Sequence, residues 1–200
     1  MITFTGIHVT QEYGTPNLRD IAVQSMRIAR FCGSGGLWLP IGIHVLVVAD
    51  ILAADPETAH LEHHGLLHDS PEVCVNDVPR PMKTNAARKL EDKVLARIYR
   101  EQGLKLPTAR EQALVKAADI RAVNVEGVME CGPRGFGDIQ QNIDRADCLA
   151  AFFMRRYLDQ FKPEDAINPN GRWPLELESR LRVAVTQVHN RAKVRKIKGF

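Results

Sequence analysis

The chain has 200 residues and a formal net charge of +3, from 27 Lys and Arg against 24 Asp and Glu. Hydrophobic residues make up 44% and charged residues 26%, values near the globular average, so a disordered or fibrous chain is excluded. This small positive charge does not indicate a nucleic-acid-binding protein, and the length predicts a single domain over residues 1–200.

Helix signals follow one another through the first third of the chain. The Thr-Pro pair at 15–16 is typical of an N-cap followed by a first-turn proline, and it predicts a helix whose apolar face extends over 18–29. A glycine-rich break follows at 33–36. Helical periodicity resumes over 40–52, and a further helix is expected at about 56–68, ending before a proline.

The middle of the chain predicts two long helices. Residues 84–102 place their apolar side chains on one side, and Gly103 closes that helix. The motif Thr108-Ala-Arg-Glu111 is a capping box, which predicts that a long helix begins there and continues through Glu126.

The last third predicts a loop at 131–137, a helix over 143–158, a proline-bearing loop at 162–172 and a final helix near 174–194. Alternation with period two is nearly absent, and no repeat of about 20–50 residues is visible. We therefore expect an all-α fold: one compact bundle of about six to eight helices, with residues 191–200 as a flexible basic tail.

Cysteine usage and the terminal segment indicate the compartment. The four cysteines are far apart and form no CxxC pair, which argues against a disulfide framework or a zinc knuckle. The N-terminal residues lack the pattern of a signal peptide. The longest apolar run, at 41–52, is too short to span a bilayer. These features predict a cytoplasmic protein with no membrane partner.

Metal-ligating side chains are densest between residues 60 and 83. His68 and Asp69 are adjacent at the end of an apolar-faced helix, and imidazole nitrogen with carboxylate oxygen suits a first-row divalent metal. Alone, such a pair is usually an ordinary helix end. Glu72 and Asp77 follow in a proline-stiffened loop, where neighbouring carboxylates are costly unless a cation or a proton compensates them.

Two further polar side chains stand on apolar helix faces. His44 lies on the apolar stripe of the 40–52 segment, where a lone imidazole is more often a satisfied core residue than a ligand. Asp119 lies near the apolar face of its helix, and a buried carboxylate needs a partner, which a metal would supply. Together with His68 and Asp69, these residues supply two imidazoles and two carboxylates for one ion.

The order H…HD…D on successive helices resembles the HD-domain phosphohydrolases over most of the chain. The pattern maps onto His44, the pair His68–Asp69, and Asp119. The stretch HDSPEVCVNDVPRPMK is similar to HDxxExxxGDxPxPxK of the small nucleotidase branch, with Asn76 in place of the usual glycine. Asn tolerates left-handed backbone better than most residues, so this departure is mild.

Two further matches extend the resemblance. The branch has an Arg–aromatic pair shortly before the first His, and Arg30 and Phe31 fill that place. Glu126 matches a recurring DxxxxxxE spacing that begins at Asp119.

The resemblance implies one divalent transition metal (Co, Mn, Zn or Fe) and leaves room for an additional Mg²⁺ on the substrate phosphates. The implied ligands are the H…HD…D residues, His44, His68, Asp69 and Asp119. Glu72 is expected to align or deprotonate the attacking water, and Asp77 to hold that water or protonate the leaving oxygen.

The same resemblance implies the substrate-binding residues. Arg30 and Lys83 are the cations that we expect on the phosphates, since guanidinium binds them bidentately and ammonium binds them as a point charge. Phe31 either stacks on a base or packs in the core.

The implied function is a metal-dependent nucleotide phosphohydrolase acting on a small deoxynucleotide. We expect a deoxynucleoside triphosphate triphosphohydrolase that favours dATP and releases deoxynucleoside and triphosphate, as phage relatives of this compact form do; a phage-encoded chain would act in the host cytoplasm. The alternative is a 5′-deoxynucleotidase acting on monophosphates. A non-catalytic nucleotide-binding HD domain is a third reading, against which Glu72 and Asp77 argue.

Partners follow from the same resemblance. Single-domain members of this family often form dimers or hexamers, so we expect a homo-oligomer. Nucleic acid is not an expected partner, because only the basic tail 191–200 would support it.

Overall fold

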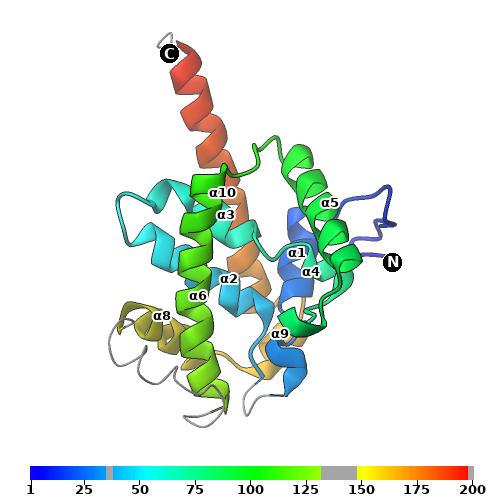
Figure 1. Ribbon diagram of the computed structural model, residues 1–200, viewed down its shortest axis with the longest axis vertical. Coiled ribbons are helices and arrows are strands. Elements are labelled where there is room, and N and C mark those ends of the chain that lie inside the picture. The colour runs from blue at the N-terminus through cyan, green and yellow to red at the C-terminus, as the bar shows by residue number, and fades with distance from the viewer. Residues whose placement is uncertain (35–37, 132–147, 198–200) are drawn as a thin grey trace.

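The computed structural model describes residues 1–34, 38–131 and 148–197. Apart from two isolated β-bridges, the regular structure of these residues is helical, so the predicted all-α fold is confirmed (Figure 1). Six of the described α-helices have eight residues or more: α1 (Leu18–Ser25), α2 (Ile41–Ala53), α5 (Asn85–Glu101), α6 (Ala109–Cys131), α8 (Cys148–Leu158) and α10 (Arg172–Ile197). The shorter elements are α3 (Glu62–Leu67), α4 (Glu72–Val75), α9 (Pro163–Ile167) and the 3₁₀ turns η1 (Arg30–Gly33), η2 (Ala59–Leu61) and η3 (Arg80–Met82).

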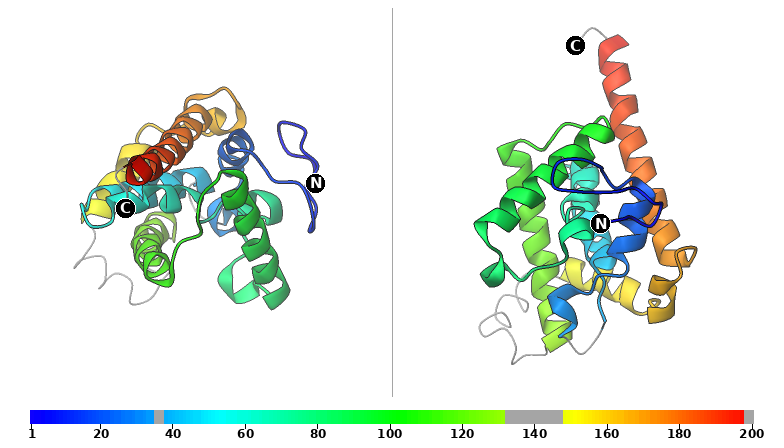
Figure 2. Two further views of the ribbon diagram at one scale, coloured as in Figure 1. Left: turned by 90° about the horizontal axis from the view of Figure 1, so that it is seen from above. Right: turned by 90° about the vertical axis from the view of Figure 1, so that its right-hand side faces the viewer.

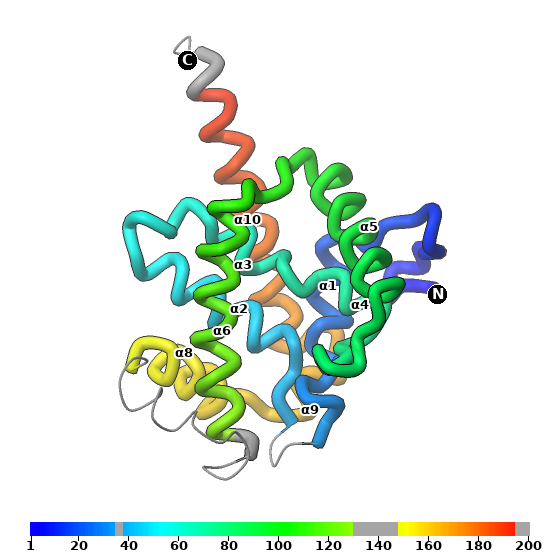
Figure 3. The backbone as a smooth tube through the Cα atoms, in the orientation of Figure 1, coloured from blue at the N-terminus to red at the C-terminus, as the bar shows by residue number. Residues whose placement is uncertain are grey.

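Helix α2 lies at the centre of the bundle because almost none of its surface is polar. Eleven of its thirteen residues are buried, and a helix that is apolar all round belongs in a core. It packs against α1, α3, α6, α8 and α10, as Figure 3 shows. The buried apolar side chains form one cluster that extends from Leu18 to Val185. His44, in the first turn of α2, is therefore shielded from water.

Helix α3 approaches α2 where a side chain would not fit. A Cβ at Gly65 would lie 2.8 Å from Leu52 Cδ1 and 3.1 Å from Ala49 Cα. Gly65 is three residues before His68, and its carbonyl oxygen lies 2.7 Å from His68 Nδ1. The close approach of the two helices thus brings the end of α3, with its histidine, beside the centre of the bundle.

Helix α1 begins later and ends earlier than the sequence indicates. Asn17, rather than Thr15, is the N-cap: its Oδ1 accepts a hydrogen bond from Asp20 N at 2.9 Å, and Asp20 Oδ2 accepts one from Asn17 N at 3.1 Å. This capping box satisfies two backbone donors at the start of the helix. The helix ends at Ser25, and the chain then turns into η1.

The predicted boundaries of α5 and α6 are confirmed. Thr84 Oγ1 accepts a hydrogen bond from Ala87 N at 3.1 Å and caps α5, and Gly103 ends it with a φ of 63°. At the start of α6, Thr108 N donates to Glu111 Oε2 at 2.7 Å and Glu111 N donates to Thr108 Oγ1 at 3.3 Å, which is the expected capping box.

Other segments differ from expectation. Residues 56–68 form η2 and α3 rather than one continuous helix, and the expected loop at 162–172 contains α9, which begins with a proline in its first turn. Of the predicted loop at 131–137, Cys131 is instead the last residue of α6, and the rest of that loop and the start of the 143–158 helix lie outside the described residues.

Helix α10 is longer than the sequence indicates. Residues 191–197, expected as part of a flexible tail, continue this helix, which extends past the rest of the molecule in two views (Figures 1 and 2). Among the described helices, none combines the length and the hydropathy that crossing a membrane requires.

Candidate metal centre

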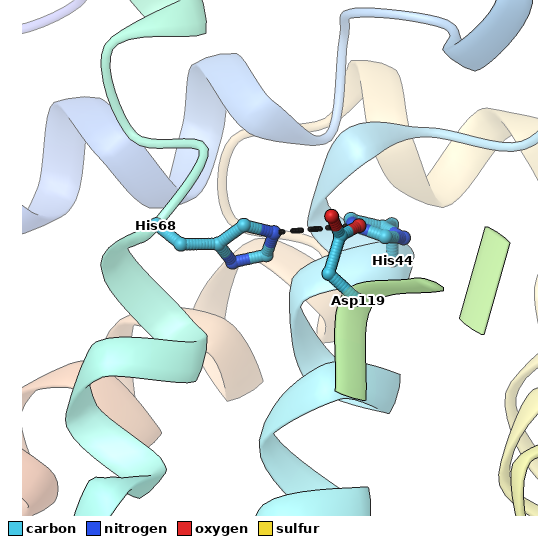
Figure 4. Close-up of side chains that lie close together, drawn as sticks. All are labelled: His44, His68 and Asp119. Carbon is cyan, nitrogen blue, oxygen red and sulfur yellow. Dashed lines mark hydrogen bonds and ion pairs between the residues drawn. The ribbon is translucent and has the colours of Figure 1, made fainter. Parts of the chain in front are cut away.

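Side chains from three helices converge at the centre of the bundle (Figure 4). His44 comes from α2, His68 from the residue that caps α3, and Asp119 from the middle of α6. His44 Nε2 lies 3.3 Å from His68 Nε2 and 3.2 Å from Asp119 Oδ1. One ligand atom from each residue lies within 4.8 Å of the other two, so this group could hold a metal ion.

Asp69 lies against the same group. Its Oδ2 is 3.4 Å from His44 Nε2 and 3.3 Å from His68 Nε2. The structure therefore places one donor atom of each of the other three residues of the H…HD…D pattern within 3.4 Å of His44 Nε2, although the four are spread over 76 positions in the sequence, from 44 to 119. Asp69 lies outside the group whose ligand atoms are all within 4.8 Å of one another.

The spacing of these donor atoms fits a single ion. Two donors about 2.1 Å from a shared ion lie about 3.4 Å apart in a tetrahedral arrangement. The separations of 3.2–3.4 Å that involve His44 Nε2 match that value, whereas His68 Nε2 and Asp119 Oδ1 are 4.0 Å apart, which is wider. Two imidazoles with carboxylates form a donor set that first-row transition metals accept.

Glu126 fixes the orientation of the His44 ring. Its Oε1 lies 2.6 Å from His44 Nδ1, and both side chains are fully buried. Its Oε2 accepts hydrogen bonds from Arg30 Nε at 3.2 Å and Nη2 at 3.1 Å. A carboxylate on the far nitrogen of a ligating imidazole holds the proton there, which leaves Nε2 to face the metal. The spacing of Glu126 is visible in the sequence; its contact with His44 is not.

Replacing Glu126 with glutamine is expected to weaken metal binding about 10–100-fold, because a neutral amide holds the His44 tautomer less strongly. Isothermal titration of the metal-free protein with Zn²⁺ measures this loss. Glu178→Gln is the matched control, since Glu178 pairs with Arg19 and Arg182 outside this cluster. Equal affinity in the Glu126 variant and in the control would contradict the orienting role.

His44, Asp69 and Asp119 shift one another's pKa. Burial and Arg30 oppose a proton on His44, but Glu126 and Asp119 outweigh them and raise its pKa to about 10. Burial works against ionisation of Asp69 and Asp119, yet the two histidines hold the pKa of each carboxyl well below its usual range. The cluster thus favours added positive charge at its centre.

The predicted catalytic carboxyls lie beside this centre. Glu72 begins α4 and is 6% exposed, and its Oε2 has no hydrogen-bond partner within the described residues. Burial, followed by the charges of Asp69 and Asp77, raises the pKa of Glu72 to about 9. Asp77 Oδ2 lies 3.9 Å from Arg30 Nη1, which is also 3.6 Å from Asp69 Oδ2. Arg30 therefore links Asp77 to the metal-ligand group.

Two loops that carry these residues have left-handed backbone. Phe31 and Cys32 have φ values of 54° and 55°, and Asn76 has a φ of 73° with a ψ of 162°. Cys32 Sγ lies 3.7 Å from the carbonyl oxygen of Asp77, so the loops touch. Such backbone angles cost about 1–3 kcal/mol each and gather at functional sites. The pattern that the sequence resembles has a glycine where this chain has Asn76, and that glycine indicated a backbone conformation of this kind.

Replacing Asn76 with glycine is expected to raise the free energy of unfolding by about 1 kcal/mol, because its backbone angles lie in a region that glycine alone enters freely. Urea denaturation followed by circular dichroism measures the change. An alanine at the same position serves as the opposite control and is expected to destabilise. A glycine variant no more stable than the native chain would show that this loop carries no strain.

The predicted substrate-binding cations are engaged with carboxylates. Arg30 donates to Glu126 as described and lies 5.5 Å from the centre of the Phe31 ring. Lys83 Nζ is 2.7 Å from Glu91 Oε1 and 3.7 Å from Glu72 Oε1. Phe31 is half-buried. Arg30 and Lys83 therefore both adjoin the predicted catalytic carboxyls.

Lys116 is a site residue that the sequence analysis missed. Its Nζ pairs with Asp119 Oδ2, the oxygen that does not face His44. The signal was its position three residues before Asp119, which places both side chains on one face of α6.

The remaining histidines near the motif have a structural role or lie at the surface. His64 is buried, and its Nδ1 lies 2.8 Å from the hydroxyl oxygen of Tyr99, which joins α3 to α5. Burial, and then His63, lowers the pKa of His64 to about 4. His60 is exposed. None of these three belongs to the metal-binding group in the described residues.

The protein is expected to lose stability on acidification, in part through His64. The folded chain keeps this ring neutral down to about pH 4, whereas the unfolded chain takes up a proton near pH 6.5. The unfolded state binds more protons in this window, so the contribution is full above pH 6.5 and is lost as pH falls. His64→Gln should reduce the loss between pH 7 and pH 5 by about 1 kcal/mol in urea titrations. An unchanged pH dependence would contradict this assignment.

No protein-family model matches the chain, and no curated protein matches it. The resemblance to HD-domain phosphohydrolases therefore stays a prediction from the motif, beside a geometry that can hold a metal ion.

Proposed function

We propose that the chain is a metal-dependent nucleotide phosphohydrolase of the HD-domain type. The observation that carries this proposal is the convergence of His44, His68 and Asp119 from three helices, with ligand atoms within 4.8 Å of one another. Asp69 is the proposed fourth ligand, because its Oδ2 lies within 3.4 Å of both imidazole nitrogens. The resemblance in sequence supplies the class of reaction.

The metal would supply Lewis acidity, which neutralises phosphoryl oxygens and makes hydroxide available near neutral pH. Glu72 is the proposed acid–base group, because its Oε2 is buried and has no partner within the described residues. The charge of a bound metal would lower the pKa of this carboxyl, and the resulting carboxylate would orient the attacking water and take up its proton. Asp77, linked to the same centre through Arg30 Nη1, is proposed to hold the water or to protonate the leaving oxygen.

We propose that the substrate is a deoxynucleoside triphosphate, with dATP favoured. Water attacks the α-phosphorus, the bond from phosphorus to the 5′ oxygen breaks, and the leaving oxygen takes a proton to give deoxynucleoside and triphosphate. Arg30 and Lys83 would bind the phosphates in exchange for part of their contacts with Glu126 and Glu91. Guanidinium and ammonium groups suit this exchange, since phosphate oxygens are also anionic acceptors.

One observation favours the alternative, a 5′-deoxynucleotidase. Arg30, Lys83 and Lys116, the cations described around the centre, each pair with a carboxylate. A triphosphate tail needs several cations beyond the α-phosphate, whereas a monophosphate needs fewer.

The experiment that separates the candidates is product analysis. The protein is incubated with each dNTP and each dNMP in the presence of Mn²⁺, Co²⁺, Zn²⁺ or Fe²⁺, with and without Mg²⁺, and the products are resolved by anion-exchange chromatography. Triphosphate from dATP supports the first proposal. Release of orthophosphate from dNMPs while the dNTPs stay intact supports the alternative, the 5′-deoxynucleotidase, instead. Nucleotide binding without turnover in the presence of any of these metal ions would indicate a non-catalytic nucleotide-binding module. Size-exclusion chromatography of the same sample tests the expected homo-oligomer.

A further inference from the structure

Arg180 of α10 holds the first residue of α3 against the last turn of α2. Its Nη2 donates a hydrogen bond to Glu62 Oε1 at 2.6 Å, and its Nη1 donates one to Asp50 Oδ1 at 2.6 Å. Helix α8 also holds Asp50, since the Tyr157 hydroxyl donates to its Oδ2 at 2.7 Å. Burial works against the charge of Arg180, but Asp50 and Glu62 outweigh it and raise its pKa above the ordinary value. One charged guanidinium thus ties α3 to α2, and we call Asp50, Glu62 and Arg180 the clamp.

The clamp and the metal centre lie on the same two helices, at opposite ends of α3. This helix starts at Glu62 and is capped by His68, which Figure 4 shows at its end. On α2, Asp50 follows His44 by six residues, the same interval that separates Glu62 from His68. Six residues extend about 9 Å along a helix axis. The two helices therefore run antiparallel, joined by the clamp at one end of their contact and by the two histidines of the metal centre at the other.

Where Gly65 meets Ala49, the contact between these helices offers little resistance to sliding of α3 along α2. A Cβ at Gly65 would lie 3.1 Å from Ala49 Cα, so the two backbones approach closely there. A glycine places no side chain in the groove of the facing helix, and the ridge that would oppose sliding is missing at this point. The His68 ring would move with α3, because its Nδ1 lies 2.7 Å from the carbonyl oxygen of Gly65. The position of α3 along α2 thus sets the position of this ring.

We infer that Arg180 is a positioning residue of the metal centre, which fixes α3 along α2 and thereby sets the separation of His44 and His68. The Nε2 atoms of the two histidines are 3.3 Å apart, close to the value of about 3.4 Å for two ligands of one tetrahedral ion. Metal–nitrogen bonds vary by only about 0.2 Å, so a slide of about 1 Å would take His68 out of bonding distance. This inference rests on the metal centre of the proposed function and deepens it, but it does not depend on which reaction the centre carries out.

The test is isothermal titration of the metal-free full chain with Zn²⁺, together with the absorption spectrum of the Co²⁺-loaded protein. Glu62→Gln and Arg180→Gln should each weaken Zn²⁺ binding about tenfold, the lower limit for residues that support metal ligands. Both should also shift the Co²⁺ d–d bands, because these bands report the coordination geometry. Arg180→Lys should restore part of the affinity, since an ammonium keeps the charge but not the fork that spans two carboxylates.

Two controls separate positioning from general stability. Tyr157→Phe is the matched control, because it removes the bond from α8 to Asp50 and leaves the link between Arg180 and α3 in place. Val185→Ala removes buried apolar surface from α10 without touching the clamp. Both variants should bind Zn²⁺ as the native chain does and keep its Co²⁺ spectrum, although Val185→Ala unfolds at lower urea concentration.

The remaining outcomes also decide. If circular dichroism shows that Arg180→Gln does not fold, Glu62→Gln decides, since the Glu62 side chain is 27% exposed. Native Zn²⁺ affinity with a native Co²⁺ spectrum in Glu62→Gln would overturn the positioning role and leave the metal centre in place. An equal loss of affinity in Val185→Ala would overturn it as well, because the effect would then follow stability alone. Absence of Zn²⁺ and Co²⁺ binding by the native chain would overturn this role together with the metal centre, whereas a chain that binds metal but hydrolyses no nucleotide would overturn the proposed function alone.

Discussion

Replacing Asp119 with alanine is expected to abolish stoichiometric metal binding while the helical fold persists. Asp119 Oδ1 lies 3.2 Å from His44 Nε2 and is the oxygen that α6 supplies to the centre. Its loss leaves donors from two neighbouring helices only, and a transition metal held by fewer protein ligands binds far more weakly. Elemental analysis of the purified protein measures the metal, and circular dichroism measures the fold.

Asp159→Ala is the matched control, because Asp159 is an exposed aspartate at the end of α8 and should leave metal content unchanged. Asp69→Ala tests the fourth ligand in the same way and is also expected to lose stoichiometric metal. Full occupancy in the Asp119 variant would reject the centre itself. Full occupancy in the Asp69 variant alone would restrict the ligands to His44, His68 and Asp119.

The residues of the centre could be predicted because polar groups on apolar helices are conspicuous. His44 stands in a run of aliphatic residues, and Asp119 stands beside the buried face of α6. Taken alone, each of these residues has an ordinary structural explanation. Only the order H…HD…D along the chain groups them into one predicted metal site. A motif gives no distances. The structure shows that three helices place ligand atoms of His44, His68 and Asp119 within 4.8 Å of one another.

The supporting contacts could not be predicted, because they join residues that are distant in the chain and carry no local pattern. Arg30 reaches Glu126 across 96 positions, and Arg180 joins Asp50 across 130. Local rules also competed with each other at α1. Thr15 and Asn17 are both acceptable N-caps, and only the reciprocal bond from Asp20 selects Asn17.

The broken helix at 56–68 has a similar origin. Its periodicity is helical, but Thr58 Oγ1 donates a hydrogen bond to the carbonyl oxygen of Leu52 at 2.8 Å, and Leu61 N donates to Thr58 O at 2.8 Å in the 3₁₀ pattern of η2. The α-helical part therefore begins only at Glu62. A periodicity read from sequence alone does not contain such contacts.

Replacing Glu72 with glutamine is expected to lower kcat by about 10²–10⁴-fold while metal content stays unchanged. Glutamine keeps the size of the side chain but can neither take up nor deliver a proton at that position. The unpartnered, buried Oε2 of Glu72 is the reason to assign it this role. Turnover of the best substrate from the product analysis, with metal content measured on the same sample, separates a chemical defect from loss of the ion.

Glu72 Oε1 lies 3.7 Å from Lys83 Nζ, and this contact offers a second role for Glu72, which is to position the lysine. If Glu72 only positions Lys83 for the phosphate, its glutamine variant should raise KM and leave kcat near the native value, since Lys83 also holds Glu91 at 2.7 Å. If Glu72 handles the proton of the attacking water, kcat falls and KM changes little. Glu57→Gln, an exposed control, should change neither constant. A native kcat in the Glu72 variant would therefore move this carboxyl from the reaction to the binding of phosphate.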